Sequence, residues 1–313
     1  MRLTSYPAVM TRDSTRPNRQ RGEEHGTFVV GYLRPSTRWQ LCGIWNWVTN
    51  SVSSLNNGVI SIFGGSPLLP DDYVCTQEYS IELLSVDPLV IYVNGFVKDH
   101  EINHLVHKTK DNFTPSYVYD YKTENNKIAS EVNSTWRSST SAMVSKKDPV
   151  SRCLAKRLKS LMGNLQHPDT ERLQLVKYVG GERFRMHNDY LPVHLEAKHP
   201  DGSTKKYNRL VSSFIYIGDD CTGGETYFPD IKGVGPGADG DKFSRTEDGM
   251  GLLVKPKKGN AVIWHNVHQN GTGDDRMAHA GLPVLNGTKI GMNLFGIYYP
   301  DEPLVGGSEV PSI

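Results

Sequence analysis

Three His-x-Asp pairs stand out because histidine and aspartate at positions i and i+2 of a strand can bind one metal ion. Side chains two residues apart on a strand point to the same face and lie about 6–7 Å apart. The pairs begin at His167, His187 and His199. Proline occupies the middle position of the first and third pair and disfavours a regular strand. Only the pair His187 and Asp189 lies in a strand-like stretch, so it is our candidate metal site.

A third ligand would complete the set of two histidines and one carboxylate that leaves open positions on Fe(II). Three later histidines compete for this role: His265, His268 and His279. Ten residues after His279, Lys289 lies in a strand-like segment that is otherwise mostly apolar. A buried cation in such a place needs a partner or a ligand. The residues alone leave the third ligand open, and an ion-paired lysine remains an alternative at position 289.

The hydrophobic pattern predicts helices first and then many short strands. Asp99 is expected to cap a first helix, and Asp148 followed by Pro149 is typical of a second helix start, with Gly163 ending that helix. After Glu171 the period changes to two. Eight strands are expected, at 173–179, 183–190, 209–217, 225–228, 251–255, 260–264, 277–284 and 288–299. This order predicts a mainly β fold with flanking helices, of the α+β class.

The composition excludes several classes of protein. The chain has 313 residues, 37% of them hydrophobic, with 35 basic and 34 acidic side chains, which excludes a disordered chain and gives no footprint for nucleic acid. The most apolar stretch, 39–63, is interrupted by asparagines, so no membrane span is expected. We find no secretory signal and slightly favour the cytoplasm. The four cysteines lack a CxxC pair and are expected to be buried thiols rather than a zinc site or a disulfide framework.

Several segments resemble the prolyl 4-hydroxylase group of the Fe(II)/2-oxoglutarate-dependent dioxygenase superfamily. They occur in the family's order and spacing: LQLVKY (173–178), RFRMHNDY (183–190), GGETYFP (223–229), KPKKGNA (255–261), DRMAHAGLPV (275–284) and GTK (287–289). Weaker similarity reaches back to WRSS (136–139) and DPL (87–89), so the resemblance covers about residues 86–300. Residues 1–85 carry no such similarity.

The resemblance implies a double-stranded β-helix, also called a jelly-roll or cupin-like core, over about residues 171–300. It implies a catalytic domain at 86–313, preceded by a partly flexible N-terminal extension at 1–85. The long polar segments 111–146 and 230–251 are expected to border the mouth of its site.

The same resemblance assigns the site. It implies Fe(2+) held by His187, Asp189 and His279. It also implies that Lys289 binds the distal carboxylate of 2-oxoglutarate, helped by Tyr178 and Thr226, because an ammonium in a partly dry pocket pairs with a carboxylate. Ascorbate is an optional further cofactor, and Arg137 is the candidate substrate-binding residue.

The implied reaction is hydroxylation of an unactivated C–H bond, with 2-oxoglutarate and O2 converted to succinate and CO2. The partners are therefore 2-oxoglutarate, O2 and an organic or peptidyl-proline substrate. Phe295 stands where the family usually has tryptophan, and His265 where it has phenylalanine, so a small-molecule natural product stays open as substrate. Two other classes remain: a zinc-dependent hydrolase with the same ligands, and a non-catalytic β-barrel binding module. Lys289 separates the first from an oxygenase, because a hydrolase needs no 2-oxoglutarate anchor.

Strand parity adds a geometric expectation. A two-residue hairpin at Asn286-Gly287 would pair Val284 with Lys289 and place His279 and Lys289 on opposite faces. Since both side chains are expected in one site, we predict an odd-length connection here, or a bulge near residues 281–283.

Overall fold

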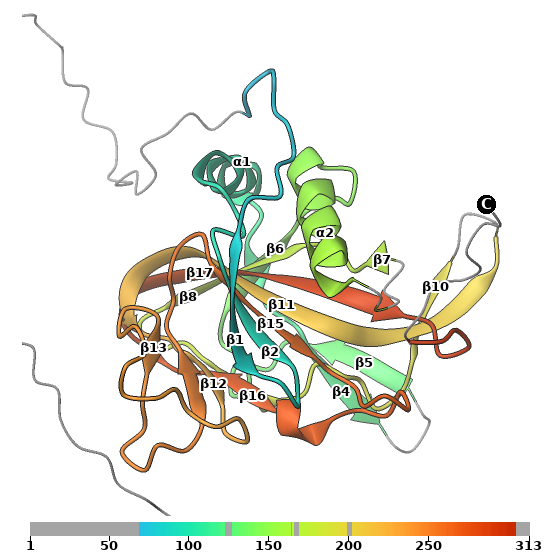
Figure 1. The fold of residues 1–313 in the computed structure, drawn as a ribbon. Helices are drawn as coiled ribbons and strands as arrows, with labels where there is room; N and C mark the ends of the chain where they lie inside the picture. The colour runs from blue at the N-terminus through green and yellow to red at the C-terminus, as the bar shows by residue number, and fades with distance from the viewer. Residues whose placement is uncertain (1–68, 123–126, 164, 166–168, 199–201, 305–313) are drawn as a thin grey trace, which may run out of the picture. The chain divides into compact units, whose positions relative to one another are not determined.

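Figure 1 shows the computed structural model of the chain, which describes residues 69–122, 127–163, 165, 169–198 and 202–304. The expected extension up to residue 68, the apolar stretch 39–63 and the His-x-Asp pairs that begin at 167 and 199 lie wholly or partly outside these residues. Among the described helices, none is long and apolar enough to cross a bilayer.

Two antiparallel sheets form the body of the fold. The strand order of the larger sheet is β1 (Ser80–Ser85), β2 (Val90–Asn94), β15 (Ala261–His265), β11 (Thr204–Gly223), β17 (Val284–Tyr298), β8 (Gln174–Val179), β6 (Thr140–Met143) and β3 (Thr114–Pro115), with β10 (Leu195–Lys198) on β11 and β7 (Asp169–Thr170) on β17. The smaller sheet runs β13 (Phe243–Ser244), β14 (Leu252–Val254), β12 (Thr226–Phe228), β16 (His279–Gly281) and β9 (Phe184–His187). A separate hairpin joins β4 (Val118–Lys122) to β5 (Lys127–Glu131).

The larger sheet has a hydrophobic core on each face. On one face, helices α1 (Asp99–Thr109) and α2 (Pro149–Met162) bury leucines such as Leu105 and Leu154 against Leu175 of the sheet. On the other face, Tyr216 packs with Phe228 of the smaller sheet. Figure 1 shows both helices on one side of the larger sheet, with β12 and β16 on the opposite side. The mainly β fold with flanking helices is therefore confirmed, and the site lies between the two sheets.

The signals predicted for the second helix, α2, are confirmed. The Asp148 carboxylate accepts hydrogen bonds from the N–H groups of Val150 and Ser151, and Gly163 ends the helix with φ of 58°. The predicted cap of helix α1 is wrong by one residue, because Asp99 is already helical and Lys98 is the N-cap. The N–H of Lys98 donates to the Glu101 carboxylate. A short 3₁₀ helix at Asp275–Met277 leads into β16.

The odd-length connection expected at Asn286-Gly287 is not found. Strand β17 runs straight through these residues, with Asn286 opposite Thr222 and Gly287 opposite Cys221. Gly287 is needed because its φ is 80° and a Cβ there would collide with the carbonyl of Asp220. The chain turns instead between β16 and β17, where it passes from the smaller sheet to the larger one. The parity argument fails because it treated the segments that carry His279 and Lys289 as partners in one sheet.

The expectation of four unpaired thiols is also wrong, because Cys75 and Cys153 form a disulfide. The bond joins the segment before β1 to helix α2, and Cys221 is a free cysteine. Residues 80–85, which belong to the expected extension, pair with β2 as an edge strand. The domain boundary at residue 85 stays a prediction.

A buried ion pair holds the helices together. The guanidinium of Arg157 donates to both carboxylate oxygens of Glu101 at 2.7 and 2.8 Å, and both side chains are almost fully buried. Arg157 also donates to the carbonyl of Thr76, and the Tyr73 hydroxyl donates to Glu101. Burial raises the pKa of Glu101, but Arg157 and the other donors outweigh it and hold the pKa below its usual value.

Candidate active site

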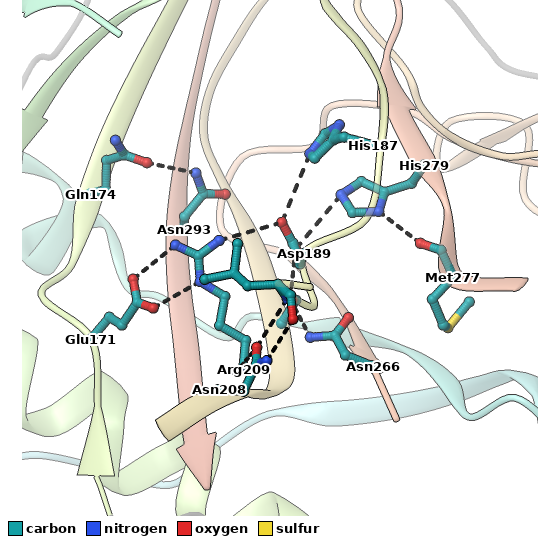
Figure 2. Close-up of polar contacts among 12 residues, drawn as sticks. Glu171, Gln174, His187, Asp189, Asn208, Arg209, Asn266, Met277, His279 and Asn293 are labelled. Atoms are coloured by element: carbon teal, nitrogen blue, oxygen red, sulfur yellow. Dashed lines mark hydrogen bonds and ion pairs between the residues drawn. The ribbon is translucent and has the colours of Figure 1, made fainter. Parts of the chain in front are cut away.

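His187, Asp189 and His279 lie together at one edge of the smaller sheet. His187 ends β9, Asp189 follows in the next loop, and His279 begins β16 directly opposite His187. The Nε2 atoms of His187 and His279 lie 3.8 and 3.7 Å from the carboxylate oxygens of Asp189. Figure 2 shows the Asp189 carboxylate facing both imidazoles. Among the described residues, these three form the group of ligand atoms that could hold a metal ion.

The tautomers of both histidines suit metal binding. The Nδ1 atoms of His187 and His279 lie 2.7 and 2.9 Å from the carbonyls of Arg185 and Met277. A carbonyl oxygen can only accept, so each Nδ1 must carry the proton. In a neutral imidazole this leaves the lone pair on Nε2, which faces Asp189.

The electrostatics keep His187 and Asp189 in their metal-binding forms. Burial, and then the neighbouring His279, lower the pKa of His187 to about 3, so this imidazole is neutral at physiological pH. Burial raises the pKa of Asp189, but the nearby histidines, Arg209 and a hydrogen bond from Ser212 hold it below its usual value. Two neutral imidazoles and one carboxylate are the donor set that suits Fe(II) and leaves coordination positions open.

The two competing histidines lie elsewhere. His268 is exposed, with its Nδ1 atom 3.6 Å from Asp274. His265 ends β15 opposite Val211, and it is not among the residues that line the cavity beside the triad.

Lys289 lies in the same cavity, which has a volume of about 440 Å³. Its side chain is 2% exposed, and its ammonium donates to the carbonyl of Gly224 at 2.6 Å. The rings of Phe214 and Tyr178 lie 4.8 and 5.3 Å from Nζ. Burial lowers the pKa of Lys289 to about 8. No carboxylate forms a salt bridge with Lys289 in the part of the chain that the structure describes, so this cation is available for an anionic ligand.

Tyr178 and Thr226 reach the cavity from the two sheets. Tyr178 on β8 is the cross-strand partner of Lys289 on β17. Thr226 on β12 is 4% exposed, and its hydroxyl lies 2.8 Å from that of Tyr216. The residues predicted for the co-substrate therefore line one cavity with the triad. Tyr216 was missed because nothing in its strand distinguishes it from a core residue.

Arg209 is the second residue that the sequence analysis missed. Its guanidinium donates to both carboxylate oxygens of Glu171 at 2.8 and 2.9 Å, and it stacks on the ring of Phe295 at 3.7 Å. Its Nη1 atom lies 3.9 Å from Asp189. Figure 2 shows Arg209 between the carboxylates of Glu171 and Asp189. The missed signal was a cation in an apolar strand, the same signal that singled out Lys289.

Arg137, the predicted substrate residue, also lines the cavity. Its guanidinium lies over the ring of Phe184, which stacks on His187 with ring centroids 3.6 Å apart. Two of its nitrogens donate to Ser139 and to the carbonyl of Tyr117. The third, Nη2, is buried and has no hydrogen-bond partner among the described residues.

The two predicted border segments differ. Segment 111–146 contains the β4–β5 hairpin and contributes Tyr117, Tyr119 and Trp136 to the cavity lining. These aromatic side chains are 58%, 48% and 42% exposed. Segment 230–251 contributes no described residue to that lining, so the expectation is wrong for this segment.

The comparisons with known proteins agree with this geometry. A family model described as the 2OG-Fe(II) oxygenase superfamily matches residues 173–296. Prolyl 4-hydroxylase 2 of Arabidopsis thaliana is 30% identical over 216 residues, which are 67% of this chain and 67% of the relative. The chain belongs to the prolyl 4-hydroxylase-like group of the 2OG-Fe(II) oxygenase superfamily. The prolyl 4-hydroxylase subunit alpha-2 of Gallus gallus is 30% identical over 64% of this chain and 33% of that relative.

Among solved structures, the chain is similar to a viral collagen prolyl hydroxylase from Paramecium Bursaria Chlorella virus-1. The sequence identity is 21% and the TM-score is 0.45, over 66% of this chain and 94% of the viral one.

As a member of this oxygenase superfamily, the protein is a 2-oxoglutarate-dependent dioxygenase that uses Fe(2+) and 2-oxoglutarate. Members of the superfamily oxidise a C–H bond while 2-oxoglutarate is converted to succinate and CO2. Family membership rejects both alternatives, the zinc hydrolase and the non-catalytic binding module.

Proposed function

We propose that this oxygenase hydroxylates peptidyl-proline, with His187, Asp189 and His279 as the iron ligands. The supporting observation is that the triad shares one cavity with the buried cation of Lys289. Iron bound there would supply the oxidising power, by coupling decarboxylation of 2-oxoglutarate to oxidation of the substrate. The protein provides orientation, a partly dry cavity and charge.

Three residues anchor 2-oxoglutarate in this proposal. The Lys289 ammonium donates one hydrogen bond to the carbonyl of Gly224, and its other N–H groups can donate to the distal carboxylate. The hydroxyls of Tyr178 and Thr226 add neutral donors from the adjacent strand and from the opposite sheet.

The cavity mouth favours a peptide over a small molecule. Proline-rich segments dock in grooves lined by aromatic side chains. The exposed rings of Tyr117, Tyr119 and Trp136 provide such a lining. The unpartnered Nη2 of Arg137 can donate to a peptide carbonyl beside the metal. The relatives compared above are named prolyl 4-hydroxylases.

A product assay tests the substrate. The enzyme is incubated with Fe(II), 2-oxoglutarate and ascorbate, and with either proline-rich peptides or small-molecule candidates. We expect the peptides to gain one oxygen atom by mass spectrometry, with stoichiometric succinate, and the same peptides with alanine for proline to gain none. Oxidation of small molecules alone would refute the peptide substrate.

A second assay tests the iron ligands. Asp189→Ala is expected to lose iron binding and all succinate formation, because two imidazoles alone hold Fe(II) weakly. Turnover with zinc in place of iron, or an Asp189→Ala variant that keeps its iron, would refute this site.

We also propose that the chain works in an oxidising compartment. The sequence alone slightly favours the cytoplasm, whereas the Cys75–Cys153 disulfide is of a kind that persists outside reducing compartments. Peptide mapping of protein from its source, alkylated before lysis, should recover the two cysteine peptides as one linked species. Recovery of both peptides as alkylated thiols would contradict the proposal.

A further inference from the structure

Two structural features orient the histidines of the triad, and Asp189 has neither of them. His187 and His279 lie on paired strands, and each ring is tied to a backbone carbonyl through Nδ1. Asp189 lies in the loop after β9, outside any strand. Its carboxylate must therefore be oriented by something other than sheet pairing.

Two buried side chains provide that orientation. The Ser212 hydroxyl on β11 lies 2.6 Å from Oδ2 of Asp189, and Nδ2 of Asn266 lies 2.8 Å from the same hydroxyl oxygen. Ser212 and Asn266 are 0% and 1% exposed. Figure 2 shows Asn266 on the side of Asp189 away from His187.

The direction of both hydrogen bonds is fixed by chemistry. The amide nitrogen of Asn266 can only donate, so the Ser212 oxygen accepts from it. The single hydroxyl hydrogen of Ser212 is then free to donate to the carboxylate of Asp189. A hydrogen bond to a charged acceptor is stronger than a neutral one, and the donor from Asn266 polarises the hydroxyl further.

A bulge in β11 makes this arrangement possible. The register between β11 and β17 shifts between Arg209 and Val211. In a regular strand, residues three apart face opposite sides, so Arg209 and Ser212 could not both reach Asp189. The extra residue lets both side chains reach Asp189, and Ser212 then lies opposite Phe295, which lines the cavity.

We propose that Ser212 and Asn266 are positioning residues that orient the Asp189 carboxylate and so preorganise the iron site. Oδ1 of Asn266 is buried without a hydrogen-bond partner among the described residues. Among the described residues, the hydrogen bond from Nδ2 to Ser212 is therefore the polar contact of this side chain. The inference rests on the proposed role of Asp189 as an iron ligand.

The matched pair Ser212→Ala and Ser213→Ala tests the proposal. Both serines are neighbours on β11 and are buried equally, but the Ser213 hydroxyl has no hydrogen-bond partner among the described residues. The measurement is anaerobic titration of each apo variant with Fe(II), without 2-oxoglutarate. We expect Ser212→Ala to bind iron about 10- to 100-fold more weakly, and Ser213→Ala to bind as the parent does.

Two further variants separate positioning from general destabilisation. Asn266→Ala should weaken iron binding in the same direction, and adding it to Ser212→Ala should weaken binding no further, because Asn266 acts through Ser212. Ser212→Thr keeps the hydroxyl and should restore affinity. If Ser212→Ala does not fold, Asn266→Ala and Ser212→Thr decide the question.

Equal iron affinity in Ser212→Ala and the parent, or an equal loss in Ser213→Ala, would overturn the proposal. The Asp189→Ala variant, measured in parallel, shows which idea fails. Loss of iron in Asp189→Ala without loss in Ser212→Ala refutes only the positioning role. Retention of iron in Asp189→Ala refutes the metal site itself.

Discussion

Tyr178 and Lys289 are direct cross-strand partners on β8 and β17, and the Lys289 ammonium lies 5.3 Å from the centre of the tyrosine ring. Directly opposite residues of an antiparallel pair share a face of the sheet. Both side chains therefore enter the cavity between the two sheets, whereas the adjacent Lys177 lies 5.1 Å from the ring of Phe113, outside the cavity lining. The register of β8 and β17 therefore places Lys289 in the site and leaves Lys177 outside it.

The first prediction follows from this register. Lys289→Ala should weaken 2-oxoglutarate binding by about 1.5–3 kcal/mol, or about 10- to 150-fold in Kd, because a charged hydrogen bond to the carboxylate is lost. Iron affinity without 2-oxoglutarate should stay close to that of the parent. Lys177→Ala, one residue from Tyr178 on the same strand, is the control and should bind 2-oxoglutarate normally. The affinity for 2-oxoglutarate is measured by anaerobic calorimetry in the presence of Fe(II). An unchanged 2-oxoglutarate affinity in Lys289→Ala would count against Lys289 as the residue that binds the distal carboxylate.

The second prediction concerns pH. Burial lowers the pKa of Lys289 to about 8, so the free protein loses this proton as the pH rises through 8. The dicarboxylate needs the charged form, and binding above this pH must take up a proton. The Kd for 2-oxoglutarate should therefore be nearly constant below pH 7 and rise up to about tenfold per pH unit above 8.

Lys289→Arg provides the control for this pH dependence. A guanidinium stays charged throughout the range, so any affinity that remains in this variant should not change between pH 7 and 9. A constant affinity of the parent enzyme for 2-oxoglutarate between pH 7 and 9 would contradict the prediction.

How much of the site could be predicted depends on whether its signal is local. His187 and Asp189 are two residues apart near a strand, and Lys289 is a cation in an apolar segment, so both were visible in the sequence. Residues alone did not distinguish His279 from His265 and His268; the resemblance did. Ser212 carried no such signal, because a bulge in β11 brings its side chain to Asp189. Arg209 was missed although it is, like Lys289, a cation in an apolar strand.

The fold shows the same division. The pattern of apolar residues and the signals at Asp148, Pro149 and Gly163 predicted the helix and most strands, because these depend on near neighbours. The pairing of β17 with β11 and the Cys75–Cys153 disulfide depend on residues far apart in the chain. The cysteines are 78 residues apart, and no spacing rule indicated their contact.

The third prediction concerns the substrate. Arg137→Ala should raise the KM for a proline-rich peptide and leave the Kd for 2-oxoglutarate unchanged, because Arg137 lies beside Phe184 and Tyr117 rather than beside Lys289. The loss of one charged hydrogen bond suggests about a tenfold or larger effect on kcat/KM. Arg183→Ala, an exposed arginine next to Phe184, should behave as the parent. Steady-state kinetics with varied peptide makes the measurement, and an effect confined to 2-oxoglutarate would reassign Arg137 to the co-substrate.

The fourth prediction tests the ion pair between the helices. Arg157→Met should lower the free energy of unfolding by about 3–5 kcal/mol, because the Glu101 carboxylate is left buried without its cation. Adding Glu101→Gln should recover part of this loss, since the amide carries no charge and can still accept from the N–H of Lys98. Denaturant unfolding of the parent, the single variant and the double variant makes the comparison.

The loss of unfolding free energy in Arg157→Met should depend on pH. In the parent, Arg157 and the other donors hold the pKa of Glu101 below its usual value, so the stability it contributes disappears as the pH falls through that lowered pKa. In Arg157→Met, the effect of burial on Glu101 is no longer offset by Arg157, so the pKa of Glu101 should rise. Protonation of Glu101 at low pH then removes the free-energy cost of a buried, unpaired carboxylate. The gap in stability between parent and variant should therefore narrow as the pH falls towards the usual pKa of a glutamate. A gap that stays constant with pH would show that lost packing of the arginine, rather than an unpaired carboxylate, destabilises the variant.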